Sequence, residues 1–231
     1  MIQDPKDQHI KAIVTHFELT GKDVLEIGCG KGRITRDLAK YARSVVAIDP
    51  DMTALAHARA TISAENVEFK SAPEGIPKLP EKSFDLVIYT LSLHHVPEQE
   101  MLQSLKSAGR LLREEGRILV LEPGDGGSFN ELKRRFGAGS GDEAPEKAAA
   151  IRAMQNLEGW SMGETIHFEA EFLFNDAEDF FINKLPDYRQ FSAEKLAEIT
   201  EFLNRHTTDN GIILSTERRL NGLIRKRTGT V

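Results

Sequence analysis

The sequence predicts a doubly wound α/β fold: a seven-stranded sheet, mostly parallel with an antiparallel C-terminal strand, and helices on both of its faces. Five short, almost continuously apolar runs alternate with segments whose apolar residues recur at helical spacing. That pattern is typical of parallel strands that are buried on both faces. A strictly alternating run at 166–174 follows and predicts an antiparallel strand, and the last strand is expected within 212–226.

Composition places the chain among ordinary globular proteins. It has 231 residues, of which 40% are hydrophobic, enough for one large α/β domain. No apolar run approaches the roughly 18 residues that a membrane span needs, and no signal peptide follows the polar start. The single cysteine, Cys29, excludes an internal disulfide and suits a reducing compartment. We therefore expect a cytoplasmic protein without a membrane span.

Charge and histidine spacing disfavour two kinds of partner. The net charge of −6 argues against nucleic acid as a partner. The seven histidines show no metal-ligand spacing, so we expect no metal site. Nothing in the sequence indicates a homo-oligomer.

The expected elements follow in order from the N-terminus. Apolar residues at 10, 13, 14 and 17 predict a helix ahead of the first strand. Strands are predicted over 24–27, 44–49, 67–69, 84–89 and 118–121, with helices that begin near 34, 50 and 97. We expect Pro50 in the first turn of its helix, and a turn at Gly116 and Arg117 before the fifth strand. Later, glycines crowd 124–141, a helix is expected around 145–157, and Ser192 is expected to cap another.

The stretch 24–35, V-L-E-I-G-C-G-K-G-R-I-T, carries the chemistry. Gly28, Gly30 and Gly32 lie between a buried strand and a helix. Glycine is needed where the backbone takes positive φ, or where a ligand lies against bare backbone. In the dinucleotide-binding pattern G-x-G-x-x-G, the third glycine would fall on Arg33, so this chain departs from that pattern.

Two acids refine the class of ligand. Glu26 lies two residues before the first glycine, where a carboxylate suits a cationic ligand better than a pyrophosphate. Asp49 ends the next strand, about twenty residues on, and offers two acceptor oxygens to a ribose diol. Together with the glycine spacing, these acids favour an adenosyl ligand with positive charge and no phosphate, such as S-adenosylmethionine.

At these residues the sequence resembles the class I S-adenosylmethionine-dependent methyltransferases. The resemblance is closest to the small-molecule group with a type 11-like domain, which includes quinone-biosynthesis C-methyltransferases. It rests on V-L-E-I-G-C-G-K-G, V-V-A-I-D, S-F-D-L-V-I, L-H-H-V and R-I-L-V-L-E-P, and it covers residues 24–123 well and the later chain only in layout. The resemblance implies a Rossmann-like fold and transfer of a methyl group from S-adenosyl-L-methionine to a small organic acceptor.

The resemblance also implies a set of cofactor-binding residues. The glycines would let the backbone approach the methionine part, Glu26 would orient the turn and the ammonium, and Asp49 would bind the ribose hydroxyls. Pro50 and Met52 would lie against the adenine, and the backbone N–H of Ala72 would meet its edge. The full set is Glu26, Gly28, Cys29, Gly30, Gly32, Asp49, Pro50, Met52, Ser71, Ala72, Thr90 and Leu91.

One position in this set departs from the family. Relatives commonly carry an acid after the third strand to receive the adenine amino group, and this chain has Ser71 there. Thr90 and Leu91, just past the fourth strand, would lie near the methionine and the sulfonium. Cys29 is interpreted as a small filler of the turn rather than a nucleophile.

Three residues are candidates for catalysis: His94, His95 and Glu122. A neutral imidazole titrates in the right range to act as a general base beside an acceptor. Alternatively, the two histidines cap the next helix or pack under a lid, and Glu122 binds only its own backbone turn. A base is needed only where the acceptor is a hydroxyl, an amine or an acidic carbon.

Some acceptors are disfavoured. Family members that methylate planar amino groups carry an (Asp/Asn)-Pro-Pro-aromatic turn after the fourth strand, and this chain has T-L-S-L at 90–93. Arsenite methylation needs several cysteines, and this chain has only Cys29. A non-catalytic S-adenosylmethionine-binding protein and an NAD-dependent oxidoreductase stay as alternative functions.

The expected organisation is one domain: an N-terminal helix cap (1–20), a cofactor-binding core (21–123), an insertion or lid (124–163), and C-terminal strands and helices (164–231).

Overall fold

The structure is a computed structural model that describes residues 1–226; the last five residues of the expected C-terminal region, 227–231, lie outside the described residues. The chain forms two compact units, and each is described by itself. Unit 1 comprises residues 1–9, 123–144 and 167–218, and unit 2 comprises, within the described residues, 10–122, 145–166 and 219–226. The expected lid segment, 124–163, is therefore divided between the two units.

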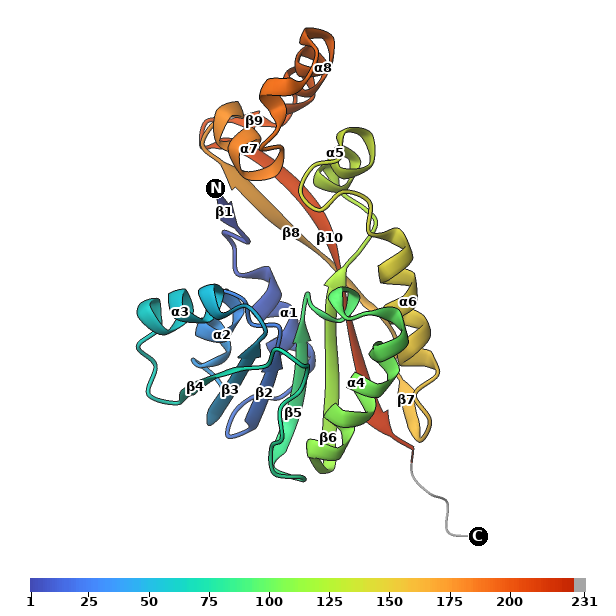
Figure 1. Ribbon diagram of the computed structural model, residues 1–231. Coiled ribbons are helices and arrows are strands. Elements are labelled where there is room, and N and C mark those ends of the chain that lie inside the picture. The colour runs from blue at the N-terminus through green and yellow to red at the C-terminus, as the bar shows by residue number, and fades with distance from the viewer. Residues whose placement is uncertain (227–231) are drawn as a thin grey trace. The chain divides into compact units, whose positions relative to one another are not determined.

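Parallel strands form the centre of unit 2 (Figure 1). They are β2 (Asp23–Ile27), β3 (Ser44–Asp49), β4 (Val67–Ser71), β5 (Phe84–Thr90) and β6 (Leu112–Pro123). Their spatial order is β6-β5-β2-β3-β4, and neighbouring strands are parallel throughout. After β4 the chain returns to the other side of β2, so the strand order reverses between β2 and β5. Open α/β sheets bind ligands beyond the carboxyl ends of the strands at such a reversal.

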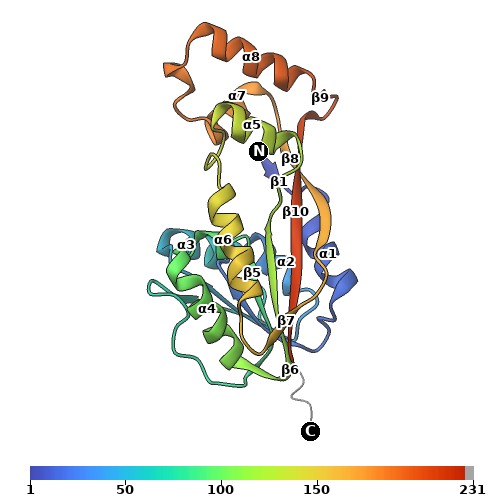
Figure 2. The same ribbon diagram turned by 90° about the vertical axis from the view of Figure 1, so that its right-hand side faces the viewer.

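Helices cover this sheet on both faces. They are α1 (Gln8–His16), α2 (Arg33–Leu38), α3 (Met52–Thr61), α4 (Glu98–Leu111) and α6 (Ala144–Gln155), with a short 3-10 helix, η1 (Leu93–His95). Figure 2 shows α4 and α6 on one side of the sheet and α1 on the other. Met101 and Leu105 of α4 share one buried cluster with Ala150 and Met154 of α6 and with Val87 of β5. The apolar faces of these helices therefore close the core of unit 2.

Unit 1 is built on an aromatic core. Its elements are β1 (Ile2–Gln3), α5 (Ser128–Phe136), β8 (Ile166–Phe174), α7 (Ala177–Lys184), a 3-10 helix η2 (Tyr188–Gln190), α8 (Ala193–Asn204) and β9 (Thr207–Thr208). Phe174, Phe180 and Phe202 are among its fully buried side chains. The side chain of Ser192 accepts a hydrogen bond from the N–H of Lys195, which confirms the expected helix cap. The last strand, β10 (Gly211–Arg225), runs through both units.

The sheet confirms the predicted architecture and adds three short strands to it. Ten strands form in the described residues rather than the expected seven. β1 and β9 have two residues each and β7 (Trp160–Met162) has three; β1 pairs antiparallel with β8, and the other two pair antiparallel with β10. Runs of this length are too short to show a period of two in a sequence. The seven longer strands are the predicted ones.

Two local predictions are wrong. Pro50 does not lie in the first helical turn, because α3 is capped by Asp51, whose carboxylate accepts from the N–H groups of Thr53 and Ala54. Gly116 does not end a turn before the fifth strand either. It lies inside β6, which starts at Leu112 and shifts register against β5 between Phe84 and Leu86, as a β-bulge does.

None of the helices in residues 1–226 combines the length and the apolarity that crossing a membrane would require.

Candidate functional site

The glycine turn after β2 takes a backbone conformation that side chains other than hydrogen disfavour. Gly28, Gly30 and Gly32 have φ angles of 77°, 52° and 80°. A Cβ on Gly28 would lie 2.1 Å from the Cβ of Ser92, so this glycine also allows a close approach between segments. A Cβ on Gly30 would meet nothing within 4 Å. The turn is therefore tightly packed at its first glycine and open at its second.

Glu26 lies beneath this turn and joins three elements. Its carboxylate is fully buried in β2. One oxygen, Oε2, accepts a 2.5 Å hydrogen bond from the hydroxyl of Thr35 in α2, and the other, Oε1, accepts a 2.9 Å bond from the hydroxyl of Thr90 at the end of β5. Buried charges require such partners, because an unpaired carboxylate away from water is strongly destabilising. Through these two hydrogen bonds Glu26 holds the glycine turn between α2 and β5.

Burial also changes the acidity of Glu26. Removal from water raises the pKa of its carboxyl group to about 7, and the two hydroxyl donors and the Arg33 charge offset only part of that rise. A positive charge brought close to this carboxylate would favour its ionised form. The site therefore favours a cationic group on its ligand.

Asp49, the last residue of β3, holds the open part of the turn. Its Oδ2 accepts a 2.6 Å hydrogen bond from the N–H of Gly30, and its Oδ1 accepts a 2.9 Å bond from the N–H of Asp51. A carboxylate has about four lone-pair positions, so each oxygen keeps the capacity for a further donor. Met52 follows at the start of α3 with 57% of its surface exposed, a large apolar side chain beside this acid.

The third strand ends close to Asp49 in the sheet. Ser71 is the register partner of Asp49, and Ala72 follows it. The N–H of Ala72, expected to meet an adenine edge, donates a 3.0 Å hydrogen bond to the carbonyl oxygen of Asp49. This donor is used inside the chain, so a contact from Ala72 to a ligand would have to come from another of its atoms. Cys29 is buried in the turn, and burial beside Glu26 and Asp49 raises the pKa of its thiol, which suits a filler.

The segment that leaves β5 is strained and packs directly on the glycine turn. Leu91 has a φ of 58°, which is uncommon for a residue with a branched side chain. Next to it, the hydroxyl of Ser92 donates a 2.6 Å hydrogen bond to the carbonyl oxygen of Ile27. Backbone strain of this kind persists only where the surroundings enforce it, and it is concentrated at functional sites.

The catalytic candidates fall into one linked pair and one neighbour. Glu122, near the end of β6, is buried; its Oε1 accepts a 2.9 Å hydrogen bond from the N–H of Leu93, and its Oε2 contacts Nδ1 of the buried His94. A carboxylate at Nδ1 orients the imidazole and directs Nε2 away from it. His95 is exposed, and its ring centroid lies 4.0 Å from that of His94.

Thr35 and Ser92 complete the site but were not among the expected residues. Thr35 donates a hydrogen bond to Glu26, and Ser92 packs against Gly28. Thr35 offered one signal, since a buried helix face rarely carries a hydroxyl without a partner. Ser92 offered none, because its contact with Gly28 joins segments more than sixty residues apart.

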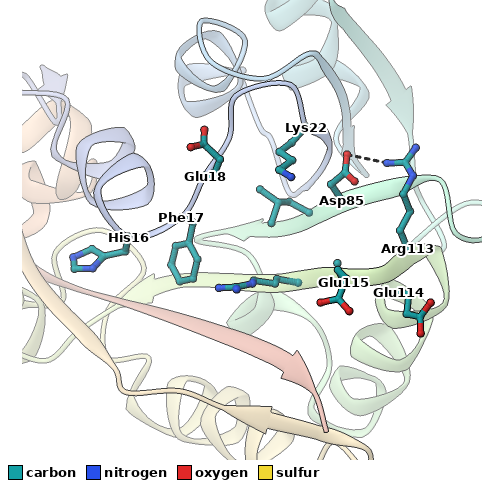
Figure 3. Close-up of a pocket in the computed structure, with 11 residues that line it drawn as sticks. His16, Phe17, Glu18, Lys22, Asp85, Arg113, Glu114 and Glu115 are labelled. Atoms are coloured by element: carbon teal, nitrogen blue, oxygen red, sulfur yellow. Dashed lines mark ion pairs between the residues drawn. The ribbon is translucent and has the colours of Figure 1, made fainter. Parts of the chain in front are cut away.

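A cavity of about 650 Å³ lies elsewhere in unit 2 (Figure 3). Lys22, Asp85 and Arg113 line it, and they stand before or at the amino ends of β2, β5 and β6. Arg113 pairs there with Asp85 at 2.8 Å. The glycine turn follows the carboxyl end of β2, so the cavity and the candidate site lie at opposite edges of the parallel sheet.

The chain is similar in sequence to known methyltransferases. Residues 24–116 match the family of methyltransferase domains. A probable S-adenosylmethionine-dependent methyltransferase of Mycobacterium tuberculosis is 36% identical over 104 residues, which cover 45% of this chain and 36% of that protein. The chain spans between 36% and 56% of the length of the curated relatives that it matches first.

Solved structures share the fold over nearly the whole chain. A methyltransferase of Aquifex aeolicus matches with a TM-score of 0.56 and 14% identity, over 94% of each chain. A phosphoethanolamine N-methyltransferase of Haemonchus contortus, solved with S-adenosylhomocysteine, matches with a TM-score of 0.55 and 18% identity over 97% of this chain and 45% of its own. At sequence identities this low, the similarity shows a shared fold and nothing more.

Substituting Gly28 tests the close contact in the turn. Gly28→Ala adds a Cβ that collides with Ser92 at a residue with positive φ, so the free energy of unfolding should fall by about 2 to 4 kcal/mol. Gly75→Ala is the matched control, because Gly75 has a φ of 87° and open space around it, and only the backbone strain of about 1 kcal/mol applies. Urea unfolding measures the free energy of unfolding of both variants. Equal losses in the two variants would contradict the close contact between Gly28 and Ser92.

Glu26→Gln tests the raised pKa. In the folded protein the pKa rises from 4.5 to about 7, so the folded state binds the extra proton between these values. The stability that depends on the protonated carboxyl is complete below pH 4.5 and is lost as the pH rises through 7. Relative to the glutamine variant, the parent should lose about 3 kcal/mol of unfolding free energy across this range. If the unfolding free energies of parent and Glu26→Gln changed with pH in the same way, the raised pKa of Glu26 would be ruled out. The control Glu68→Gln, at an exposed acid, should show the same pH dependence as the parent.

Proposed function

We propose that the chain is a class I S-adenosylmethionine-dependent methyltransferase, on the premise that residues 24–116 match a methyltransferase domain, and that it transfers the methyl group of S-adenosylmethionine to a small organic acceptor. The observation that carries the proposal is the linkage of Gly30 to Asp49 above the buried Glu26. It combines open glycine backbone, acceptor oxygens and a buried negative charge at one edge of the sheet. An adenosyl sulfonium with an amino-acid end needs these three features.

Each part of the ligand has a matching group in the chain. The bare backbone at Gly30 would face the methionine part, and the Glu26 carboxylate beneath it would favour the cationic ligand. The carboxylate of Asp49 would accept from the ribose hydroxyls while it holds the turn. Met52, exposed in the described structure, would lie against the adenine together with Pro50. Thr90 and Leu91 would border the sulfonium.

When bound, S-adenosylmethionine supplies a methyl group that is already activated by the sulfonium. The chain then has to hold donor and acceptor in line and to exclude water. Positioning of this kind can supply roughly 7 to 11 kcal/mol of the barrier. The hydrogen bonds around Glu26 and Asp49 hold the turn in place before any ligand arrives, which lowers the entropy lost on binding.

His94 would receive the proton of an acidic acceptor, and Glu122 would position it. The carboxylate of Glu122 holds Nδ1 of His94, so Nε2 is the atom that would take the proton. Glu122 acts through His94 and is a positioning residue. The small organic acceptor is supported by T-L-S-L at 90–93, where family members that act on planar amino groups carry prolines.

Calorimetry with S-adenosylhomocysteine tests the cofactor. We expect binding by the parent, and about tenfold to hundredfold weaker binding by Asp49→Ala, because hydrogen bonds to a charged group are lost. Glu68→Ala, an exposed acid on the neighbouring β4, should bind as the parent does. Heat with NADH alone would refute the proposal in favour of an oxidoreductase. Equal binding by parent and Asp49→Ala would refute the ribose assignment.

Methyl transfer from labelled donor to a pool of small metabolites tests the activity and the base. With an acceptor found in this way, His94→Gln should lower kcat about 10²-fold or more and flatten the pH profile, since the proton acceptor is lost. Glu122→Gln should lower kcat less, and the exposed His57→Gln should have no effect. Binding of S-adenosylhomocysteine without any labelled product would support the non-catalytic binding protein instead.

A further inference from the structure

The cavity at the amino edge of the parallel sheet lies where β6 leaves its regular pairing with β5 (Figure 3). Leu112 of β6 pairs with Phe84. The next pair joins Arg117 to Leu86, so β5 advances by two residues while β6 advances by five. The residues of β6 between these pairs, 113–116, form a large bulge, and all of them line the cavity. Bulges direct side chains away from the regular ladder, and they are frequent beside functional sites.

The bulge is tight, and the cavity beside it has fixed apolar walls. Gly116 is buried, and a Cβ there would lie 2.9 Å from the Cβ of Leu112. Leu86 is buried and Phe17 is half-buried, and both line the cavity. The ring of Phe17 lies over Gly222 of β10, where a Cβ would come within 2.8 Å of it. The glycines thus hold the bulge and the ring in place, and the apolar walls suit the body of an organic ligand.

Charged side chains of both signs line this cavity without pairing with one another. The half-buried Lys22 and the exposed Arg117 are cationic, and the exposed Glu114 and Glu115 are anionic. The charged ends of these four side chains make no hydrogen bond and no ion pair with any of residues 1–226. Figure 3 shows Lys22 on the opposite side of the cavity from Glu114 and Glu115. Opposite charges that do not reach each other across a cavity can be bridged by a molecule that carries both signs.

Other charged groups of the cavity are already engaged within the chain. Arg113 pairs with Asp85 at 2.8 Å. Glu18 accepts a 2.8 Å hydrogen bond from the N–H of Thr20, and this bond and the charge of Lys22 lower the pKa of its carboxyl group. The groups that remain for a ligand are therefore balanced, two cations against two carboxylates.

We propose that this cavity binds a small zwitterion with an apolar body, an anionic group at one end and an ammonium group at the other. Lys22 binds the anionic group and Arg117 adds a second positive charge, while the two carboxylates of the bulge bind the ammonium group. The body lies against Phe17 and Leu86. The volume of about 650 Å³ lies within the range of small-molecule sites, roughly 300 to 1,000 Å³.

This site is separate from the methyl transfer proposed above. All of its residues belong to unit 2, and they lie at the edge of the sheet opposite to the glycine turn. Its test therefore needs neither S-adenosylmethionine nor an acceptor, and its failure would leave the proposed function untouched.

A nuclear magnetic resonance titration with 4-(aminomethyl)benzoate tests the site, because this probe has an aromatic body with a carboxylate and an ammonium group at its ends. We expect saturable shifts of the backbone amide signals of residues 113–117, with a Kd in roughly the millimolar range. The signals of the glycine turn, residues 28–32, should not shift. Benzoate and benzylamine keep the ring and lack one charge each, so each should bind about tenfold more weakly.

Variants assign the two ends of the probe. Lys22→Met removes a cation and keeps an apolar stem, so the zwitterion should bind about tenfold more weakly and benzylamine as it binds to the parent. The double variant Glu114→Gln with Glu115→Gln should weaken the zwitterion similarly and leave benzoate binding unchanged. Lys106→Met is the matched control, because Lys106 is an exposed lysine of α4 outside the cavity, and this variant should behave as the parent does.

The proposal is overturned if the zwitterion does not shift the signals of residues 113–117, or if benzoate or benzylamine binds as tightly as the zwitterion. Equal binding of the zwitterion by Lys22→Met and the parent would also overturn it. Circular dichroism shows whether the variants fold. If Lys22→Met does not fold, the titrations of the parent with the three probes decide.

Discussion

The burial of one carboxylate, that of Glu26, is the constraint on which the candidate site depends. Placing this acid in the core of a parallel sheet requires partners, and the hydroxyl groups of Thr35 and Thr90 supply them from a helix and a second strand. The same hydrogen bonds hold the glycine turn between β2, α2 and β5. The two hydrogen bonds only partly offset the loss of hydration, so the pKa of Glu26 is raised. A nearby positive charge would stabilise its ionised form.

The second acid extends this arrangement across the sheet. Asp49 ends β3 and binds the backbone of Gly30, so the turn of one strand is fastened to the end of the next. The reversal of strand order between β2 and β5 leaves the space beyond these strand ends to a ligand. His94 and Glu122, at the ends of β5 and β6, lie at this same edge of the sheet, whereas the 650 Å³ cavity lies at the other.

Unit 1 solves a different physical problem, since its aromatic core contains cations. Lys184 is held by two phenylalanine rings, and Arg218 by His9 and Thr216. Cations within an apolar core are stable only with compensating partners. Arg218 has such partners among the described residues, and for Lys184 the faces of the two rings supply part of this compensation.

The sequence by itself determined the parallel core, the seven longer strands, the glycine turn and its two acids, because apolar periodicity and glycine spacing are local properties. It could not show the three short strands, the bulge at Gly116 or the cap at Asp51 in place of Pro50. Only the tertiary structure decided that Thr35 and Ser92 belong to the site, that the N–H of Ala72 is used within the sheet, and that Glu122 holds His94. Apart from the bond between Thr35 and Glu26, each of these depends on contacts between segments more than twenty residues apart, which no local pattern encodes.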